Sequence, residues 1–171
     1  KEIDGGVISG ILILNDGKRV IMILDAEKII KSGSFDAAAN QRYMSVKNLT
    51  CAETIENEEE QIVIFSIGTE EYAFSINYVK EIIRLPEIMK VPNTADCIEG
   101  IFSIRNELLA VINLGKLLGM DCKQPDEYSR VIIIKNGSLS YGVIVDKVSH
   151  VVRVQKKSFK ESYKIENSFA T

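Results

Sequence analysis

A pattern of strand, tight turn, strand and short helix occurs twice in this chain, and it constrains the fold more than any other feature. The longer copy spans residues 98–118 and the shorter one spans residues 8–31. In each copy two apolar runs flank a polar turn, and a glycine follows the expected helix. The shorter copy has Asp16-Gly17 in its turn, where glycine supplies the positive φ of a tight hairpin. The sequence therefore predicts two related hairpin–helix units.

Further short apolar runs of strand length fill most of the remaining chain. We expect strands at residues 62–67, 72–74, 130–134, 139–145 and 148–154. Residues 76–83 carry isoleucine and valine at helical spacing, which predicts a short amphipathic helix with Lys80 on its outer face. Many short strands joined by glycine-containing turns favour small β-barrels over a sheet built from βαβ units.

Burial is expected to be uneven along these strands. The run 131–134 is apolar at every position, so we expect both of its faces to be covered, as they would be where two small barrels pack together. Residues 32–59 contain an acidic run and many small polar residues, which is typical of a solvated linker. After Gln155 the chain turns polar, and we expect no closing hydrophobic element there.

The composition is that of an ordinary globular protein, with 46% hydrophobic and 26% charged residues and a net charge of −3. Its scattered basic residues lack the basic stripe of a nucleic-acid binder. Apolar runs stay far below the roughly 18 residues of a transmembrane helix, so we expect no membrane insertion. Three cysteines without C-x-x-C spacing are typical of free thiols, which favours a reducing, cytoplasmic compartment.

Sequence motifs for catalysis, metal binding or phosphate binding are missing, including G-x-G-x-x-G, H-E-x-x-H and any Cys/His cluster. The single histidine, His150, lies within an expected strand, and we interpret it as an outward-facing residue rather than a general base. Asp146 follows a buried run, and we interpret it as a carboxylate that ends a strand by accepting hydrogen bonds from backbone amides. We therefore predict a protein that is not an enzyme and holds no cofactor and no metal.

Three motifs after residue 60 together resemble the CheW-like domain of bacterial chemotaxis. They are the strand–turn–strand at 62–74 with the segment 76–82, the run IEGIFSIRNELLAVINL at 98–114, and GVIVDKV at 142–148. The resemblance implies a mainly β fold of two small, five-stranded, SH3-like barrels with short helices. This family occurs as the free adaptor CheW, in CheV proteins and as the regulatory domain of the kinase CheA. The chain departs from the family pattern at four positions, Ser103, Asn106, Ala110 and Asn113.

The family domain ends in a further hairpin and helix that residues 156–171 lack, and residues 1–31 look like that missing end. We therefore expect three parts: the C-terminal hairpin and helix of a CheW-like domain at 1–31, a linker at 32–59, and a domain body at 60–171. The chain would then be a fragment of a protein with tandem CheW-like domains, or a permuted single domain. Because a body without its last hairpin has an open sheet edge, the hairpin should dock on its own body or on a neighbour's, as a domain-swapped dimer.

The resemblance also implies an adaptor that couples the cytoplasmic tip of chemoreceptors to the histidine kinase CheA. The receptor- and kinase-binding positions that carry over are Val79, Glu81, Gly100 and Arg105. We expect Glu81 and Arg105 to form an ion pair at a groove between the barrels. The apolar residues expected beside this groove are Val79, Ile82, Phe102 and Ile104, although core positions are favoured for Ile82 and Ile104.

Three functions stay open at this point. The first is a scaffold that couples chemoreceptors to a kinase in a two-component pathway. The second is the regulatory domain of a CheA-type kinase or CheV-type protein, which a phosphotransfer helix or an ATP-binding motif elsewhere in a longer chain would identify. The third, which the sequence supports least, is an enzyme with a small-molecule pocket between the barrels.

Overall fold

The structure is a computed structural model, which describes residues 6–14, 17–32, 59–155 and 158–161. Within these residues the chain forms mostly short strands and a few short helices. In the N-terminal part these are β1 (Ile8–Leu14), β2 (Arg19–Leu24) and α1 (Ala26–Ser32). They are followed by β3 (Glu59–Ile67), β4 (Glu70–Ser75), the 3-10 helix η1 (Ile76–Tyr78), β5 (Val79–Arg84), β6 (Ile98–Ile104), β7 (Glu107–Asn113) and α2 (Leu114–Leu117). The last elements are β8 (Arg130–Asn136), β9 (Leu139–Val145), β10 (Lys147–Gln155) and β11 (Phe159–Glu161).

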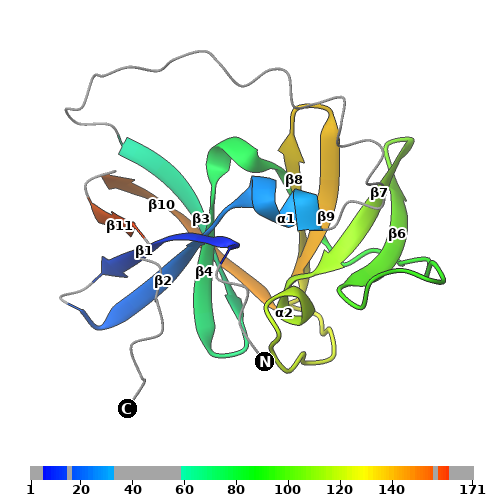
Figure 1. Ribbon diagram of the computed structural model, residues 1–171, viewed down its shortest axis with the longest axis horizontal. Coiled ribbons are helices and arrows are strands. Elements are labelled where there is room, and N and C mark those ends of the chain that lie inside the picture. The colour runs from blue at the N-terminus through cyan, green and yellow to red at the C-terminus, as the bar shows by residue number, and fades with distance from the viewer. Residues whose placement is uncertain (1–5, 15–16, 33–58, 156–157, 162–171) are drawn as a thin grey trace.

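The strands form two sheets that lie side by side, with α1 between them (Figure 1). The first sheet has the order β10-β3-β4-β2-β1-β11, and the second has the order β5-β8-β9-β7-β6. Each sheet contains one parallel pair, β2 with β4 and β7 with β9, and its other pairs are antiparallel. The mainly β fold predicted from the sequence is confirmed.

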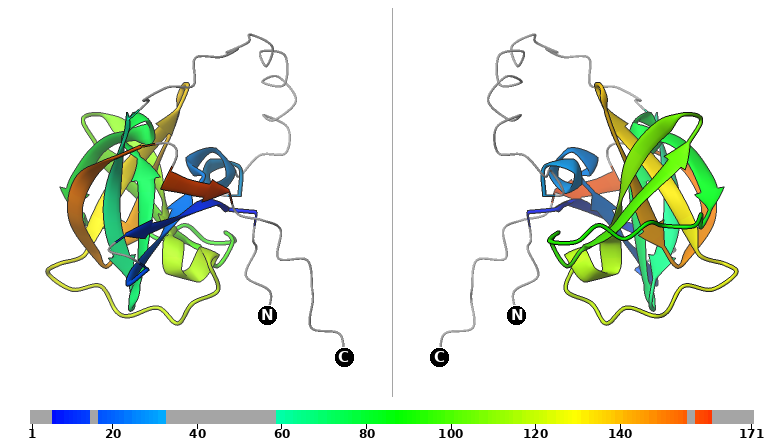
Figure 2. Two further views of the ribbon diagram at one scale, coloured as in Figure 1. Left: turned by 90° about the vertical axis from the view of Figure 1, so that its left-hand side faces the viewer. Right: turned by 90° about the vertical axis from the view of Figure 1, so that its right-hand side faces the viewer.

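The first sheet closes into a barrel through one bent stretch of chain. Strands β10 and β11 lie at opposite edges of the sheet, yet only residues 156–158 separate them. The stretch therefore pairs first with β3 and then with β1, where Ile11 faces Lys160. Both views of Figure 2 show β11 beside β1. Because β10 and β11 act as one bent strand, the six strands make a five-membered barrel, which we call the first barrel.

The second sheet closes in the same way. Beyond the end of β5, Met89 forms an isolated bridge with Ile101 of β6, with two backbone hydrogen bonds of 2.8 and 2.9 Å. The neighbouring Gly100 has a φ of 145°, and a Cβ atom placed on it would lie 2.1 Å from the carbonyl oxygen of Met89. Only glycine permits this close backbone approach. We call this five-stranded unit the second barrel.

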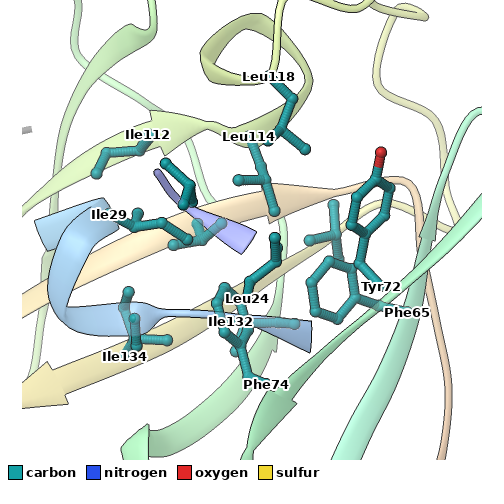
Figure 3. Packing of buried hydrophobic residues seen from close by; sticks show 14 of the residues in the cluster. Leu24, Ile29, Phe65, Tyr72, Phe74, Ile112, Leu114, Leu118, Ile132 and Ile134 are labelled. Carbon is teal, nitrogen blue, oxygen red and sulfur yellow. The ribbon is translucent and has the colours of Figure 1, made fainter. Parts of the chain in front are cut away.

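Three apolar clusters form the core of the two barrels. One fills the first barrel, one fills the second, and the largest lies between them (Figure 3). In β8, Val131 and Ile133 point into the second barrel, whereas Ile132 and Ile134 point into the cluster between the barrels. This confirms that residues 131–134 are covered on both faces. Burial of these side chains is the main source of stability of such a domain.

The N-terminal hairpin and α1 belong to this assembly. Strand β2 lies between β1 and β4 in the middle of the first sheet, and β1 pairs with β11. Leu12 and Ile21 are fully buried inside the first barrel. Ile29 and Ile30 of α1 are buried in the cluster between the barrels. The hairpin therefore docks on the body of its own chain, one of the two arrangements expected from the sequence.

Two expectations about individual elements are wrong. The predicted helix at 76–83 is the single turn η1 followed by strand β5, which pairs with β8. A register shift between Val79 and Glu81 interrupts the alternation of this strand, and the apolar spacing then resembles that of a helix. The second error concerns the chain after Gln155, where β11 closes the first barrel through backbone pairing rather than through an apolar pattern.

The two barrels share one topology. Strands β1, β2, β3, β4 and β10 of the first barrel correspond to β6, β7, β8, β9 and β5 of the second, and α1 corresponds to α2. The register shifts also correspond, because β1 is irregular between Ile8 and Gly10 and β6 is irregular between Ile98 and Gly100. The similar hairpin–helix units predicted from the sequence are therefore equivalent parts of two equivalent barrels.

Both helices also begin in the same way. The backbone N–H of Asp25 donates to the carbonyl of Val7 at 2.8 Å, and that of Asn113 donates to the carbonyl of Cys97 at 2.7 Å. Each of these residues then caps its helix, since a side-chain oxygen accepts backbone N–H groups from the first turn. Asp and Asn are favoured at this position because they satisfy amide groups that have no partner within the helix.

Candidate protein-binding site

Two of the residues predicted to form the site, Glu81 and Arg105, meet at one end of the second barrel. Glu81 lies near the start of β5, and Arg105 lies in the turn between β6 and β7. Because β5 and β6 are the two edges of this sheet, the site lies at the seam where the barrel closes. At the other end of the same seam, Met89 pairs with Ile101.

The turn holds Arg105 in an unusual backbone conformation. Arg105 has a φ of 48° and Asn106 has a φ of 64°, as a two-residue hairpin turn of type I′ requires. Asparagine tolerates this left-handed region, whereas for arginine it costs about 1–2 kcal/mol. Backbone strain of this kind is more frequent at functional sites than elsewhere. The turn projects the arginine side chain into solvent, where it is 77% exposed.

The expected ion pair between Glu81 and Arg105 is present. An Nη2 atom of Arg105 lies 3.2 Å from Oε2 of Glu81, whose side chain is 21% exposed. A second pair, which the sequence did not predict, joins Nζ of Lys80 to Oε2 of Glu107 at 2.9 Å. Together the two pairs tie β5 to the hairpin of β6 and β7 across the seam. Pairs this exposed stabilise the fold by less than about 1 kcal/mol each, so their main effect is on geometry.

The sequence analysis places Lys80 on the outer face of a helix, and that assignment hides its pairing with Glu107. In a helix, neighbouring residues 80 and 81 would point in quite different directions. In the structure the register shift in β5 brings both side chains to the same hairpin. The charges of Lys80 and Glu107 are therefore visible in the sequence, but only the strand assignment shows that they form a pair.

The remaining predicted positions have different surroundings. Val79 is half-buried and packs against the cluster between the barrels. Gly100 is buried, and it permits the contact between β6 and Met89. Both residues therefore have a clear structural reason for their identity, while Glu81 and Arg105 provide the exposed charges of the site.

The apolar side chains expected beside the site fall into three groups. Phe102 is only 4% exposed and lies inside the second barrel, so it is core rather than surface. Ile104 is half-buried against the same cluster, in agreement with the core position favoured for it. Ile82 was also expected in the core, but it is 39% exposed because the strand alternation turns it outward. Leu108 in β7, which was not predicted, is 71% exposed.

The equivalent end of the first barrel carries a different ion pair. Arg19, at the start of β2, makes two contacts with Glu71 of β4, Nε to Oε2 at 2.5 Å and Nη2 to Oε1 at 2.6 Å. The hydrogen bonds from Arg19 lower the pKa of the Glu71 carboxyl, with a smaller contribution from the nearby His150. A two-point contact of this kind is geometrically specific as well as stronger than a single bond.

The residues considered for catalysis lie in ordinary structural settings. His150 is exposed on β10. Asp146 ends β9, and its Oδ2 accepts the backbone N–H of Gly68 at 2.8 Å, as predicted for a structural carboxylate. Of the described residues, Asp146 is the one carboxylate that lines a small pocket between the barrels, which also includes Cys122. Desolvation raises the pKa of the Cys97 and Cys122 thiols, so both are weak nucleophiles at neutral pH.

The described residues contain no group of three or more His, Cys, Asp or Glu side chains that could hold a metal ion. Among the same residues, every helix is too short or too polar to cross a membrane. Two small closed barrels packed through a shared core, with exposed charge pairs at a barrel seam, define the class of this β-rich domain.

The comparisons with known proteins give the family. Residues 61–171 match the sequence model of the CheW-like domain, and the chain belongs to this family. It is 33% identical over 107 residues to chemotaxis protein CheW of Treponema pallidum, covering 60% of this chain and 63% of that protein. It is 28% identical to chemotaxis protein CheW of Klebsiella aerogenes, over 66% of this chain and 68% of that protein. The chain thus spans slightly less than two thirds of the first of these relatives.

A solved structure agrees with the fold. The crystal structure of scaffolding protein TtCheW from Thermoanaerobacter tengcongensis has a TM-score of 0.57 and 33% sequence identity to this chain. The match covers 58% of this chain and 68% of that one. The family model begins at residue 61, so the sequence similarity it detects does not include β1, β2 and α1.

Proposed function

We propose that this chain is an adaptor of bacterial chemotaxis that couples chemoreceptors to the histidine kinase CheA. The observation that carries the proposal is the match of residues 61–171 to the CheW-like domain. The relatives in this family are named as chemotaxis proteins, and the structural neighbour is named as a scaffolding protein. The proposal assigns the chain no catalytic step, no cofactor and no metal.

The proposed contact region for a partner is the seam of the second barrel, around Val79, Glu81, Gly100 and Arg105. Arg105 presents its guanidinium on a strained turn, and Glu81 fixes the direction of that side chain. The exposed side chains of Ile82 and Leu108 supply apolar area near these charges. An apolar surface with an oriented charge suits an amphipathic helix such as the cytoplasmic tip of a receptor hairpin. Gly100 acts in this scheme indirectly, by allowing the barrel to close.

The cellular setting follows from the same proposal. The chain would act in the cytoplasm, recruited to arrays of membrane-bound receptors, and would bind no nucleic acid. In the domain organisation that we propose, residues 1–31 are the hairpin and helix that complete a CheW-like domain, 32–59 are a linker and 60–171 are the body. Residues 33–58 lie outside the described part of the chain.

The experiment that tests the proposal is a calorimetric titration of the chain with a purified receptor cytoplasmic fragment and, separately, with CheA. We expect binding to both, and we expect Arg105→Ala to weaken receptor binding at least tenfold, because it removes the exposed charge of the site. The double reversal Glu81→Arg with Arg105→Glu restores the ion pair but inverts its direction. It should keep the fold while receptor binding stays weak.

The matched control is Arg153→Ala, which removes an exposed arginine from β10, the strand of the first barrel that corresponds to β5. This variant should bind the receptor fragment as the unchanged chain does. Lack of binding to both partners by the folded, unchanged chain would contradict the adaptor function. Equal losses in the Arg153 and Arg105 variants would contradict the site.

A second candidate is a CheV-type protein or the regulatory domain of a CheA-type kinase. One observation favours it: the chain is 26% identical to chemotaxis protein CheV3 of Helicobacter pylori over 87 residues, which cover only 28% of that protein. CheW-like domains therefore occur as parts of longer proteins. The full-length gene product distinguishes these cases, because a receiver domain, a phosphotransfer helix or an ATP-binding domain would identify the longer forms.

A further inference from the structure

The two barrels have the same topology but a different chain order, and this difference has a structural consequence. In the second barrel the chain runs through β5, Met89, β6, β7, α2, β8 and β9 without entering the first barrel. The same path through the first barrel would be β10, β11, β1, β2, α1, β3 and β4. In the actual chain β1, β2 and α1 come first, and β10 and β11 come last. The first barrel is therefore completed by a segment from the other end of the chain.

The surface that receives this segment is well defined. Residues 6–32, which we call the N-terminal segment, contribute β2 along the edge of β4, where Met22 faces Tyr72. They also contribute β1 along the edge of β11, and α1 against β8 and β9. Without the segment, β4 and β11 would expose unpaired backbone groups, and the cluster between the barrels would lose Ile29 and Ile30. The rest of the domain is thus an acceptor for a strand–strand–helix ligand.

The connection between segment and acceptor leaves room for exchange. The only covalent link between them is the stretch of residues 33–58, whose 26 residues span at most about 90 Å when fully extended. That reach exceeds the diameter of about 40 Å expected for a compact domain of this size. A segment can therefore reach an adjacent acceptor as well as its own. Since every copy carries the same segment, the chemistry of the contact is identical in both cases.

We propose that the N-terminal segment of one chain binds the acceptor surface of a second copy, so that the protein forms exchanged dimers at high concentration. In dilute solution each segment occupies its own acceptor, because the tether keeps its local concentration high. The contacts of the exchanged form are those seen within one chain, including the pairing of Ile11 with Lys160. The inference is independent of the adaptor function, since it depends only on chain order and strand pairing.

The test uses disulfide trapping in the chain of residues 1–171, with Cys51, Cys97 and Cys122 first replaced by alanine. Ile11→Cys with Lys160→Cys places two thiols on facing positions of β1 and β11. Facing residues of antiparallel strands have a Cα separation suitable for a disulfide. The protein is refolded at a series of concentrations, oxidised and separated on a non-reducing gel. A bond within one chain gives a monomer, whereas a bond between exchanged chains gives a covalent dimer.

The control is Lys135→Cys with Ser140→Cys, a facing pair within the hairpin of β8 and β9 that no exchange of the segment can separate. We expect the 11–160 pair to give monomer at about 1 μM and a large share of covalent dimer near about 1 mM, the effective concentration that a short linker between binding partners can reach. The control pair should stay within one chain throughout. Only monomer from the 11–160 pair at every concentration, no bond at all, or equal dimer from both pairs would each overturn the proposal.

Discussion

The two barrels solve the same folding problem with different chain connections. Each closes through a bent stretch that pairs with both edges of the sheet, β10 with β11 in the first barrel and β5 with Met89 in the second. The second barrel is built from one continuous stretch of chain, whereas the first needs segments from both ends. The comparison teaches that strand pairing and apolar pattern determine this topology, and that the order of the elements in the chain does not.

The barrels also differ in their surface charges. The first carries the two-point ion pair of Arg19 and Glu71, with both side chains about one quarter exposed. The second carries two looser pairs at its seam, and the Arg105 side chain there is 77% exposed. The first arrangement suits structural stabilisation, and the second leaves a cation available to a partner. Four test substitutions, two of them with a control variant, and one hydrogen-exchange measurement test the comparison of the two barrels.

The largest effect is expected where the second barrel closes. Gly100→Ala would place a Cβ atom 2.1 Å from the carbonyl oxygen of Met89, at a φ of 145°. Either the bridge between Met89 and Ile101 or the glycine conformation must then change. We expect a loss of about 3 kcal/mol or more in the free energy of unfolding, measured by urea denaturation.

Gly137→Ala is the matched control, because Gly137 has a φ of 61° but no heavy atom near its Cβ position. Its cost should be about 1 kcal/mol, from backbone strain alone. Similar costs for the two variants would mean that close packing against Met89 does not determine the identity of residue 100.

The next largest effect is expected in the cluster between the barrels. Ile29 of α1 is fully buried there, and Ile29→Ala should lower the free energy of unfolding by about 2–5 kcal/mol. Leu117 in the equivalent helix α2 is only half-buried, so Leu117→Ala should cost clearly less. Denaturation of both variants, followed by circular dichroism, checks the ranking. A larger loss for Leu117 would show that α1 is not well packed in the core.

A smaller, pH-dependent effect is expected in the first barrel. Arg19 lowers the pKa of Glu71 in the folded state, so this carboxylate stabilises the protein above its ordinary pKa of about 4.3. The stabilisation is lost as the pH falls through the lowered, folded-state pKa. Glu71→Gln should therefore cost about 1 kcal/mol at pH 7 and close to nothing at pH 2. A difference that stays constant with pH would contradict this assignment.

The smallest effect is expected at the seam. Lys80→Met removes the exposed pair with Glu107 while keeping a long side chain. We expect a loss of about 0.5 kcal/mol at low ionic strength, which should vanish in about 1 M salt. Thermal denaturation at two salt concentrations checks this. A loss above about 2 kcal/mol would mean that the pair makes a large contribution to the free energy of unfolding, and that its main effect is not on geometry.

Much of the fold is readable in the sequence, because its strands are marked by local signals. The turns at Gly17 and Asn136-Gly137 end strands in the right places, and the apolar run 131–134 correctly indicates two covered faces. The failures have non-local causes. The sequence predicts a helix at β5 because a register shift distorts the alternation of this strand, and it does not predict β11 because backbone pairing with β1 carries no side-chain signal.

The candidate site was predicted less completely. The ion pair of Glu81 and Arg105 was expected from a resemblance, and the structure contains it. The pair of Lys80 and Glu107 depends on β5 being a strand, which the sequence did not reveal. The closure at Gly100 depends on Met89, eleven residues earlier, and no local pattern announces that contact.

The most direct measurement of the central comparison is hydrogen exchange of the native full chain under mild denaturant, followed by mass spectrometry of peptic peptides. If the N-terminal segment is an integral part of the first barrel, amides of β2 and β4 exchange in one cooperative step with equal free energies. Fast exchange of β2 while β4 stays protected would mean that the barrel holds together without the segment. That result would contradict the account of a first barrel completed from the opposite end of the chain.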